Sequence, residues 1–194
     1  MGYRVSWIAR SGNSSDELLQ VSRRNVTGER HEFPDVGWYL LELPNAVPSP
    51  WVVLITDGSE NFDELEASHA QSLSQDGIET LHFWCSDTVM ATELVCFKDS
   101  VEVWSVRYDS ENKSKQPALN GRIPQVAHEI LERLRIEQQT DEGADYVYDL
   151  TAELGHSIVG FRHDSDVELD DGEPFQVLCK PTSSKQAWWQ FWKS

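Results

Sequence analysis

The segment that decides the fold class is residues 78–108, which read IETLHFWCSDTVMATELVCFKDSVEVWSVRY. Apolar and polar residues alternate along three runs, 78–85, 89–97 and 101–108, and short polar turns separate the runs. Alternation with a period of two is typical of β-strands, and short polar turns join antiparallel neighbours. The segment therefore predicts an antiparallel meander of three strands.

The residues before this meander predict three more strands and two helices. The strands are expected at 3–10, 38–41 and 51–55, and the helices at 14–21 and 59–77, each begun by a capping Ser or Asn. With the first strand of the meander, the order is β-α-β-β-α-β, which is the ferredoxin-like split arrangement. We therefore predict an α+β fold with a mostly antiparallel sheet, a ferredoxin-like start extended by the meander, and helices packed on the sheet.

The C-terminal half predicts two further helices and one strand. A helix is expected from 124 to 136, a shorter one within 146–160, and a strand at 175–179. The chain beyond the second of these helices is acidic and ends in aromatic residues. We therefore predict a single α+β domain over residues 1–160 and an acidic C-terminal extension with an aromatic tail over 161–194.

The chain is strongly acidic, since 33 Asp and Glu oppose 16 Lys and Arg to give a formal net charge of −17. Residues 51–100 hold ten Asp or Glu and one Lys. Such a field repels nucleic acid and accelerates association with a cationic protein. We therefore expect no nucleic-acid binding and a basic protein partner, although solubility alone would be a simpler reason for the charge.

The sequence also predicts a cellular location. No apolar run is long enough for a signal sequence or a membrane-spanning helix. The three cysteines, Cys85, Cys96 and Cys179, are odd in number, and their spacing matches no secreted disulfide framework. These observations predict a cytoplasmic protein without integral membrane association.

Both faces of the predicted meander carry large apolar side chains. One face is expected to hold Ile78, Trp84, Leu94, Trp104 and Val106, and the other Leu81, Phe83, Val95, Phe97 and Val103. The predicted helices are too few to cover both faces. The C-terminal region or a second chain is therefore expected to complete the cover, and the oligomeric state stays open.

No set of residues predicts catalysis, a metal or a cofactor. His82, Cys85 and Cys96 have side chains that zinc accepts, but His82 and Cys85 point to opposite faces of one strand, and Cys96 is expected far along the next. The chain has no nucleophile elbow, phosphate loop or dinucleotide fingerprint. The residues best suited to a site assembled from distant segments are His82 and the neighbours His163 and Asp164.

An acidic cluster stands before and within the second predicted helix. It consists of Asp57, Glu60, Asp63, Glu64 and Glu66. No Lys or Arg occurs between Trp51 and Phe97, so these carboxylates lack local cationic partners. The alternatives are a solvated helix face and a surface that docks a basic protein.

The aromatic tail is the second candidate binding segment. Trp188, Trp189, Phe191 and Trp192 lie within five positions near the chain end. Leaving such side chains in water costs about 25 cal/mol per Å² of apolar surface. The tail is therefore expected to fold back on the domain, to dock on a partner, or to touch a membrane interface.

These patterns favour a non-enzymatic, acidic protein-binding protein, most concretely an inhibitor of the immunity type that neutralises a basic toxin or nuclease. An adaptor or assembly factor that docks through its aromatic tail is the first alternative. A small cytoplasmic enzyme with a site built from distant residues is the second.

Overall fold

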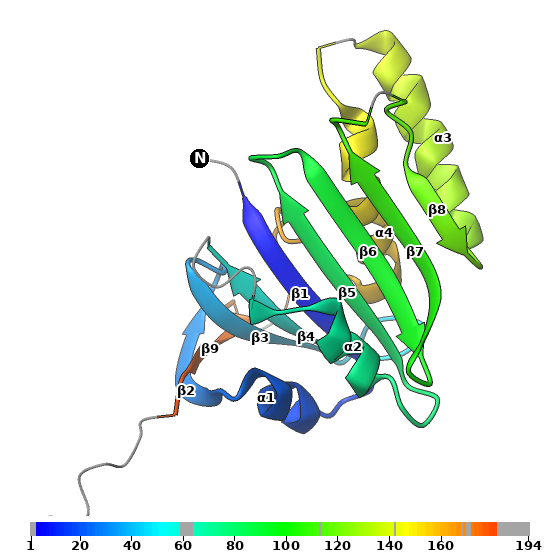
Figure 1. The fold of residues 1–194 in the computed structure, drawn as a ribbon. Coiled ribbons are helices and arrows are strands. Elements are labelled where there is room, and N and C mark those ends of the chain that lie inside the picture. The colour runs from blue at the N-terminus through cyan, green and yellow to red at the C-terminus, as the bar shows by residue number, and fades with distance from the viewer. Residues whose placement is uncertain are drawn as a thin grey trace, which may run out of the picture.

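The computed structural model describes residues 3–58, 64–112, 114–141, 143–167, 169 and 172–181. Within these residues, nine strands form one antiparallel sheet in the order β2-β9-β3-β4-β1-β5-β6-β7-β8 (Figure 1). The strands are β1 (Arg4–Ser11), β2 (Asn25–His31), β3 (Gly37–Leu43), β4 (Trp51–Asp57), β5 (Glu79–Ser86), β6 (Ala91–Lys98), β7 (Val101–Asp109), β8 (Ala118–Gly121) and β9 (Phe175–Cys179). The helices are α1 (Asp16–Ser22), α2 (Ala67–Leu73), α3 (Gln125–Thr140), the 3-10 helix η2 (Tyr146–Asp149) and α4 (Leu150–Val159).

The predicted ferredoxin-like start is present. Strands β3, β4, β1 and β5 are neighbours in that order, so the first strand lies between the last two of the β-α-β-β-α-β unit. Trp7 at the centre of β1 lies opposite Ile55 of β4 and Phe83 of β5. The predicted meander β5-β6-β7 continues the sheet beyond β5, as expected, and β8 extends it.

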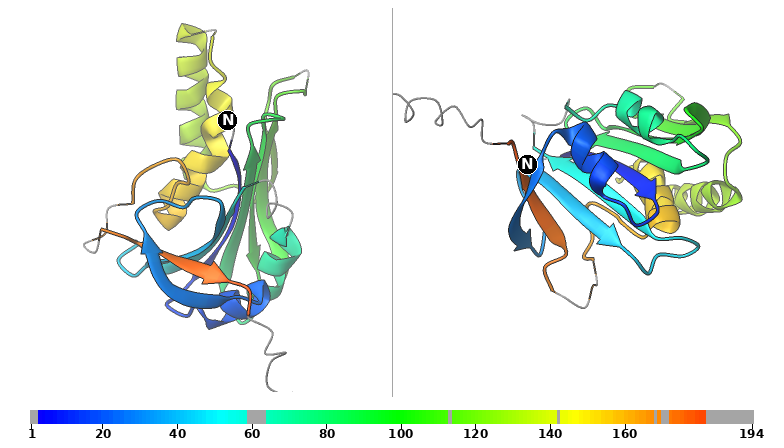
Figure 2. Two further views of the ribbon diagram at one scale, coloured as in Figure 1. Left: turned by 90° about the vertical axis from the view of Figure 1, so that its left-hand side faces the viewer. Right: turned by 90° about the horizontal axis from the view of Figure 1, so that it is seen from below.

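The sheet is covered on both faces by described helices. Helices α1 and α2 lie against one face, and α3 and α4 lie against the other (Figure 2). Neighbouring residues of β1 show the alternation, because Ile8 packs on the α1 and α2 side while Trp7 packs on the α3 and α4 side. Cover on both faces explains why β4 is almost continuously apolar.

The expected face assignment of the meander is wrong in part. Leu81 and Phe83 share a core with Leu94, Trp104 and Val106, and not with Val95 and Phe97. The strand register places Leu81 opposite Cys96 and Phe83 opposite Leu94. Register between strands depends on turn geometry, and a slip by one residue moves every side chain to the other face.

Two strands form where the sequence predicted neither a strand nor a helix. Residues 25–31 form β2, whose seven residues are all exposed, and residues 118–121 form the short β8. Strand β2 pairs with β9 at one edge of the sheet, and β8 pairs with β7 at the other. Backbone pairing, rather than burial of side chains, therefore holds β2, whereas β8 also packs Leu119 against the core.

The second predicted helix is shorter than expected. Helix α2 begins at Ala67, after a capping box in which the Glu66 backbone N–H donates to Nδ1 of His69 at 3.1 Å. The carbonyl of Leu65 faces the sheet instead of continuing a helix, and it accepts from Oγ of Ser6 at 3.2 Å. Residues 59–63 lie outside the described residues.

The C-terminal elements agree with expectation, and the sheet reaches past residue 160. Helix α3 follows Pro124, and α4 ends at Val159, where the C-cap Gly160 has a φ of 83°. Strand β9, at its predicted position, lies between β2 and β3, and Phe161 and Phe175 are 1% exposed in the core. Part of the 161–194 segment is thus built into the sheet. None of the described helices is both long and apolar enough to cross a membrane.

Candidate functional site

The structure divides the described part of the predicted acidic surface between the two faces of the sheet. Asp57 ends β4 and follows Ile55 in the alternation, so its side chain lies on the α3 and α4 side. Glu64 and Glu66 flank Leu65, which packs on the α1 and α2 side. Glu60 and Asp63, like the aromatic residues Trp188, Trp189, Phe191 and Trp192, lie outside the described residues.

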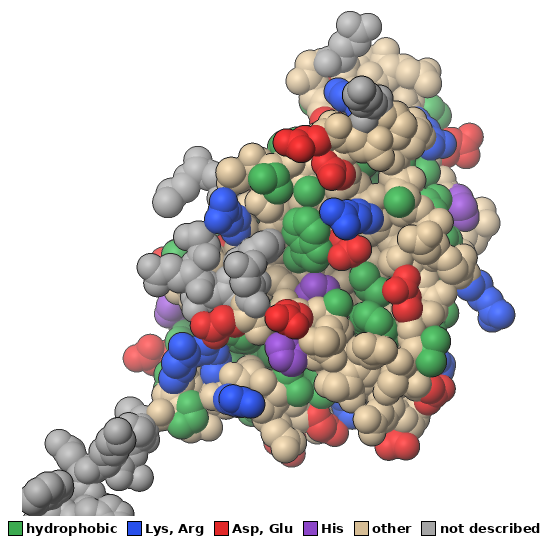
Figure 3. All heavy atoms as spheres, viewed as in Figure 1, with side chains coloured by type: hydrophobic (Ala, Val, Ile, Leu, Met, Phe, Trp, Pro, Cys, Tyr) green, Lys and Arg blue, Asp and Glu red, His purple; other side chains and the backbone are tan. Residues whose placement is uncertain are grey.

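Glu64 has cationic partners, contrary to the expectation from local sequence. Nη2 of Arg24 donates to Oε2 of Glu64 at 2.7 Å, and Nζ of Lys180 lies 3.6 Å from Oε1. The Arg24 guanidinium also lies 4.1 Å from the centre of the Trp38 ring. Local sequence missed these partners because both come from distant segments. On the face that carries α1 and α2, acidic and basic side chains are interspersed (Figure 3).

Aspartates gather instead at one end of the sheet. Strand β1 is antiparallel to β4 and β5, and β6 is antiparallel to β5 and β7, so β4, β5 and β7 run in the same direction and end together. This is the end near which the N-terminus lies in Figure 1. We call it the aspartate end, and its members are Asp35 before β3, Asp57 at the end of β4, Asp87 after β5, Asp109 at the end of β7, Asp149 at the end of η2 and Asp164 after α4.

The charges at the aspartate end are only partly compensated. Within the described part of the chain, Asp35, Asp57, Asp87 and Asp109 form no ion pair with Lys or Arg. Burial raises the pKa of Asp57 above its ordinary value, and the charge of Asp35 raises it further, against a hydrogen bond from the Gly58 N–H. An external cation would relieve this repulsion.

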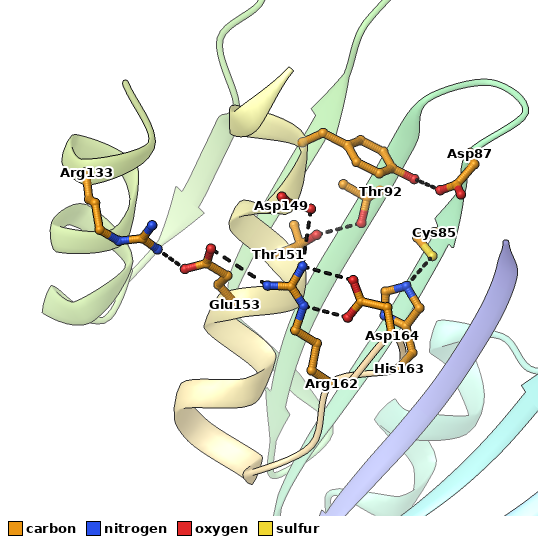
Figure 4. A network of polar contacts seen from close by, with 11 residues as sticks. Cys85, Asp87, Thr92, Arg133, Asp149, Thr151, Glu153, Arg162, His163 and Asp164 are labelled. Carbon is orange, nitrogen blue, oxygen red and sulfur yellow. Dashed lines mark hydrogen bonds and ion pairs between the residues drawn. The ribbon is translucent and has the colours of Figure 1, made fainter. Parts of the chain in front are cut away.

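A cavity of about 180 Å³ opens at this end between β5 and the η2–α4 segment. On its wall, Sγ of Cys85 lies 3.5 Å from Nε2 of His163 (Figure 4). Sequence reasoning selected both residues but gave no reason to pair them, because 78 positions separate them.

The Cys85–His163 pair is electrically neutral. Burial raises the pKa of the Cys85 thiol to about 12, and nearby carboxylates raise it as well, against a hydrogen bond from the Val5 backbone. Burial also lowers the pKa of His163, so its imidazole is uncharged at pH 7. A cysteine nucleophile needs the thiolate form. The pair thus has the spacing of a Cys–His dyad without its ionisation.

Hydroxyl groups join η2 and α4 to the meander beside this pair. Oη of Tyr148 donates to Oδ1 of Asp87 at 2.8 Å, and the Tyr3 backbone N–H donates to Oδ2 of Asp87 at 3.0 Å. Oγ1 of Thr92 lies 2.6 Å from Oγ1 of Thr151 (Figure 4). These contacts fix the wall of the cavity.

Arg162 is held by three carboxylates next to the cavity. Its guanidinium donates to both oxygens of Asp164, at 2.6 Å and 2.9 Å, and lies 3.5 Å from Oδ1 of Asp149 and 3.7 Å from Oε1 of Glu153. Burial tends to raise the pKa of Asp164, but hydrogen bonds and charge from Arg162 bring it below its ordinary value. Glu153 also pairs with Arg133 of α3 (Figure 4).

Asp149 is less well compensated than Asp164. Burial raises its pKa, and the charges of Asp164, Glu153 and Asp87 add to this effect, against the charge of Arg162, which lowers it. The sequence did not predict Asp149, because the residues around it form no recognisable motif. The aspartate end had one sequence signal, which is a single aspartate at or after the end of several strands.

His82, the other histidine singled out by the sequence, is a core residue. It is 4% exposed, and its Nε2 lies 3.1 Å from the Leu65 carbonyl and 3.3 Å from Oγ of Ser6. Burial lowers its pKa to about 4. Cys85 lies opposite Thr92, whereas Cys96 lies opposite Leu81, so the two thiols are apart in the sheet. No group of three or more His, Cys, Asp or Glu in the described ranges could hold a metal ion.

Comparisons of the chain with protein-family models, with curated proteins and with solved structures find no match.

Proposed function

We propose that this chain is a non-enzymatic protein that binds a basic protein through the aspartate end, and that it acts as an immunity-type inhibitor of a basic toxin or nuclease. One observation carries the proposal: four aspartates from separate segments, Asp35, Asp57, Asp87 and Asp109, lie at the same end of the sheet without an ion pair among the described residues. Uncompensated like charges cost stability, and a cationic partner would recover that free energy on binding.

The whole-chain charge supports the same class of partner. A formal net charge of −17 accelerates encounter with a cationic protein and opposes encounter with nucleic acid. We place the protein in the cytoplasm, where its three free cysteines would meet a reducing environment. The adaptor function depends on the aromatic tail, which lies outside the described residues.

The test compares two charge reversals of equal size at opposite ends of the sheet. Asp35→Lys with Glu111→Lys changes two exposed carboxylates at the aspartate end, where Glu111 follows the end of β7. Glu102→Lys with Glu129→Lys changes two exposed carboxylates at the start of β7 and in the first turns of α3, near the other end. Each pair raises the net charge by the same amount.

Affinity capture from native lysate should retain a basic protein on wild type and on the Glu102/Glu129 variant, and the Asp35/Glu111 variant should lose it. Retention should weaken as salt rises, because exposed charges are screened. The captured protein should then lose its own activity when one equivalent of wild-type chain is added. Equal behaviour of the two variants, or no inhibition, would overturn the proposal.

A small enzyme is the second candidate, and the Cys85–His163 cavity favours it. A neutral imidazole can act as a general base even where the thiol stays protonated. A thermal-shift screen against metabolites tests this function. A compound that raises the melting temperature of wild type but not of His163→Gln would support it, and the absence of such a compound would oppose it.

A further inference from the structure

We propose that the cavity beside Cys85 and His163 receives one arginine side chain of the basic partner. This inference rests on the proposed function and names the anchor of the same site. It follows from the size of the cavity, from the accessible and only partly compensated carboxylate of Asp149, and from the uncharged Cys85–His163 pair on the cavity wall.

The size of the cavity fits a side chain. Its volume of about 180 Å³ is roughly six times the ~30 Å³ that one water occupies in the liquid. Ligands of cofactor or drug size fill pockets of about 300–1,000 Å³. A guanidinium with its apolar stem is therefore a better occupant than a larger ligand.

Three carboxylates line the cavity, and Asp149 is the one left for an external cation. Asp87 already accepts from Tyr148 and from the Tyr3 backbone, and Asp164 already accepts two hydrogen bonds from Arg162. Asp149 has one ion-pair contact among the described residues, at 3.5 Å, and its side chain is 41% exposed. Its carboxylate is therefore both accessible and under-compensated.

The wall favours arginine over lysine. Tyr3, Phe83 and Tyr148 line the cavity, and Tyr3 is 49% exposed. Aromatic rings attract a guanidinium through their π-faces, and a planar guanidinium can also donate two parallel hydrogen bonds to one carboxylate. Arg162 already makes such a two-pronged contact with Asp164 beside the cavity.

The Cys85–His163 pair on the cavity wall is uncharged, which is compatible with a cationic occupant. Cys85 is held as a thiol, and His163 is held as an uncharged imidazole. An imidazolium at this position would repel a guanidinium, whereas an uncharged imidazole does not. Nε2 of His163 is the ring nitrogen that faces Cys85 on the cavity wall, and Nδ1 is buried without a hydrogen-bond partner among the described residues.

The probe is Nα-acetyl-arginine amide, with its lysine counterpart and its neutral citrulline counterpart as controls. Each is titrated into the full ¹⁵N-labelled chain while the amide signals of Cys85, Tyr148 and Asp149 are followed. The arginine probe should give saturable shifts at these amides. The lysine probe should bind more weakly, and the citrulline probe at least tenfold more weakly. Equal binding of arginine and citrulline probes would overturn the inference.

Two variants locate the probe. Asp149→Asn removes the charge without changing shape, and it should weaken the arginine probe at least tenfold. Asp76→Asn makes the same change at an exposed site before β5 and should leave binding unchanged. Ala152→Leu, which fills the cavity from α4 and keeps every carboxylate, should also abolish the shifts. Undiminished binding to a folded Asp149→Asn or Ala152→Leu variant would overturn the inference.

The partner captured from lysate separates this inference from the proposed function. Loss of the partner from both the Asp35/Glu111 reversal and Asp149→Asn supports both. Loss from the Asp35/Glu111 reversal alone, with full retention by Asp149→Asn, overturns the arginine anchor and keeps the proposed function. Retention by the Asp35/Glu111 reversal overturns the proposed function, even where the cavity binds the arginine probe.

Discussion

Sγ of Cys85 lies 3.5 Å from Nε2 of His163, which is the spacing of a Cys–His dyad, yet the thiol stays protonated because burial raises its pKa to about 12. A His beside a Cys usually lowers the thiol pKa by offering a positive charge. Here burial lowers the pKa of His163 as well, so that charge is missing. At this site, burial has a larger effect on the pKa of the Cys85 thiol than the neighbouring His163 has.

Thiol reactivity checks this conclusion directly. With iodoacetamide at pH 7.5, the native chain should be modified at exposed Cys179, while Cys85 and Cys96, both buried and both with a pKa raised to about 12, stay unmodified until urea unfolds the protein. Peptide mass spectrometry after timed quenching gives the rate at each position. Rapid labelling of Cys85 in the native chain would show a thiolate and would favour the enzyme function.

The contact between α4 and the centre of the sheet gives a stability prediction. A Cβ atom added at Gly155 would lie 3.0 Å from Cζ2 of Trp7, whose side chain is 1% exposed and stacked on Phe83. Overpacking costs about 1–3 kcal/mol, and Ala recovers ~1 kcal/mol over Gly in a helix, so we expect Gly155→Ala to lower the unfolding free energy by a net of about 1 kcal/mol.

Urea unfolding of Gly155→Ala checks this expectation. Ser157→Ala, on the exposed side of the same helix, is the matched control and should change the unfolding free energy by less than about 0.5 kcal/mol. A Gly155→Ala variant as stable as wild type would show that α4 can move away from Trp7.

Apolar patterning predicted the parts of this fold that are buried. Residues 51–55 and the meander repeat large apolar side chains, and they form the central strands. Strand β2 was missed because an edge strand with seven exposed residues carries no such pattern. Its partner β9 follows more than 140 residues later, so its pairing is a property of the folded sheet.

Less of the site than of the fold could be predicted. The acidic cluster led to Asp57, but the pairing of Glu64 with Arg24 depends on a contact between segments 40 positions apart. The aspartate end depends on which strands run in the same direction, and the cavity depends on how η2 and α4 dock on β5. Neither arrangement is visible in local spacing.

The Arg24–Glu64 contact predicts that Glu64 supports the fold. The Arg24 side chain is 6% exposed, so removal of the Glu64 carboxylate leaves a buried guanidinium with a weaker acceptor. We expect Glu64→Gln to lower the unfolding free energy by about 1–2 kcal/mol, while Glu29→Gln on exposed β2 changes it by less than about 0.5 kcal/mol. Denaturant unfolding of both variants checks this. If Glu64→Gln were as stable as wild type, Glu64 would not support the fold and would be a surface charge available for binding.

His82 predicts how stability falls in mild acid. Its pKa is lowered from an ordinary 6.5 to about 4 by burial, so the unfolded chain binds a proton between these pH values that the folded chain does not. The contribution of His82 to the free energy of unfolding is complete above pH 6.5, and it is lost as the pH falls from 6.5 toward 4. The loss amounts to about 3 kcal/mol at 1.36 kcal/mol per pH unit.

The His82→Gln variant isolates this contribution from other titrating groups. Glutamine can donate to the Leu65 carbonyl but does not titrate, so we expect the variant to lose less stability than wild type between pH 7 and pH 4.5. Urea unfolding at both pH values gives the difference for each protein. If wild type and His82→Gln lose the same free energy, His82 carries a proton in the folded state near pH 6.5, and the hydrogen bonds to Leu65 and Ser6 must then be those of an imidazolium.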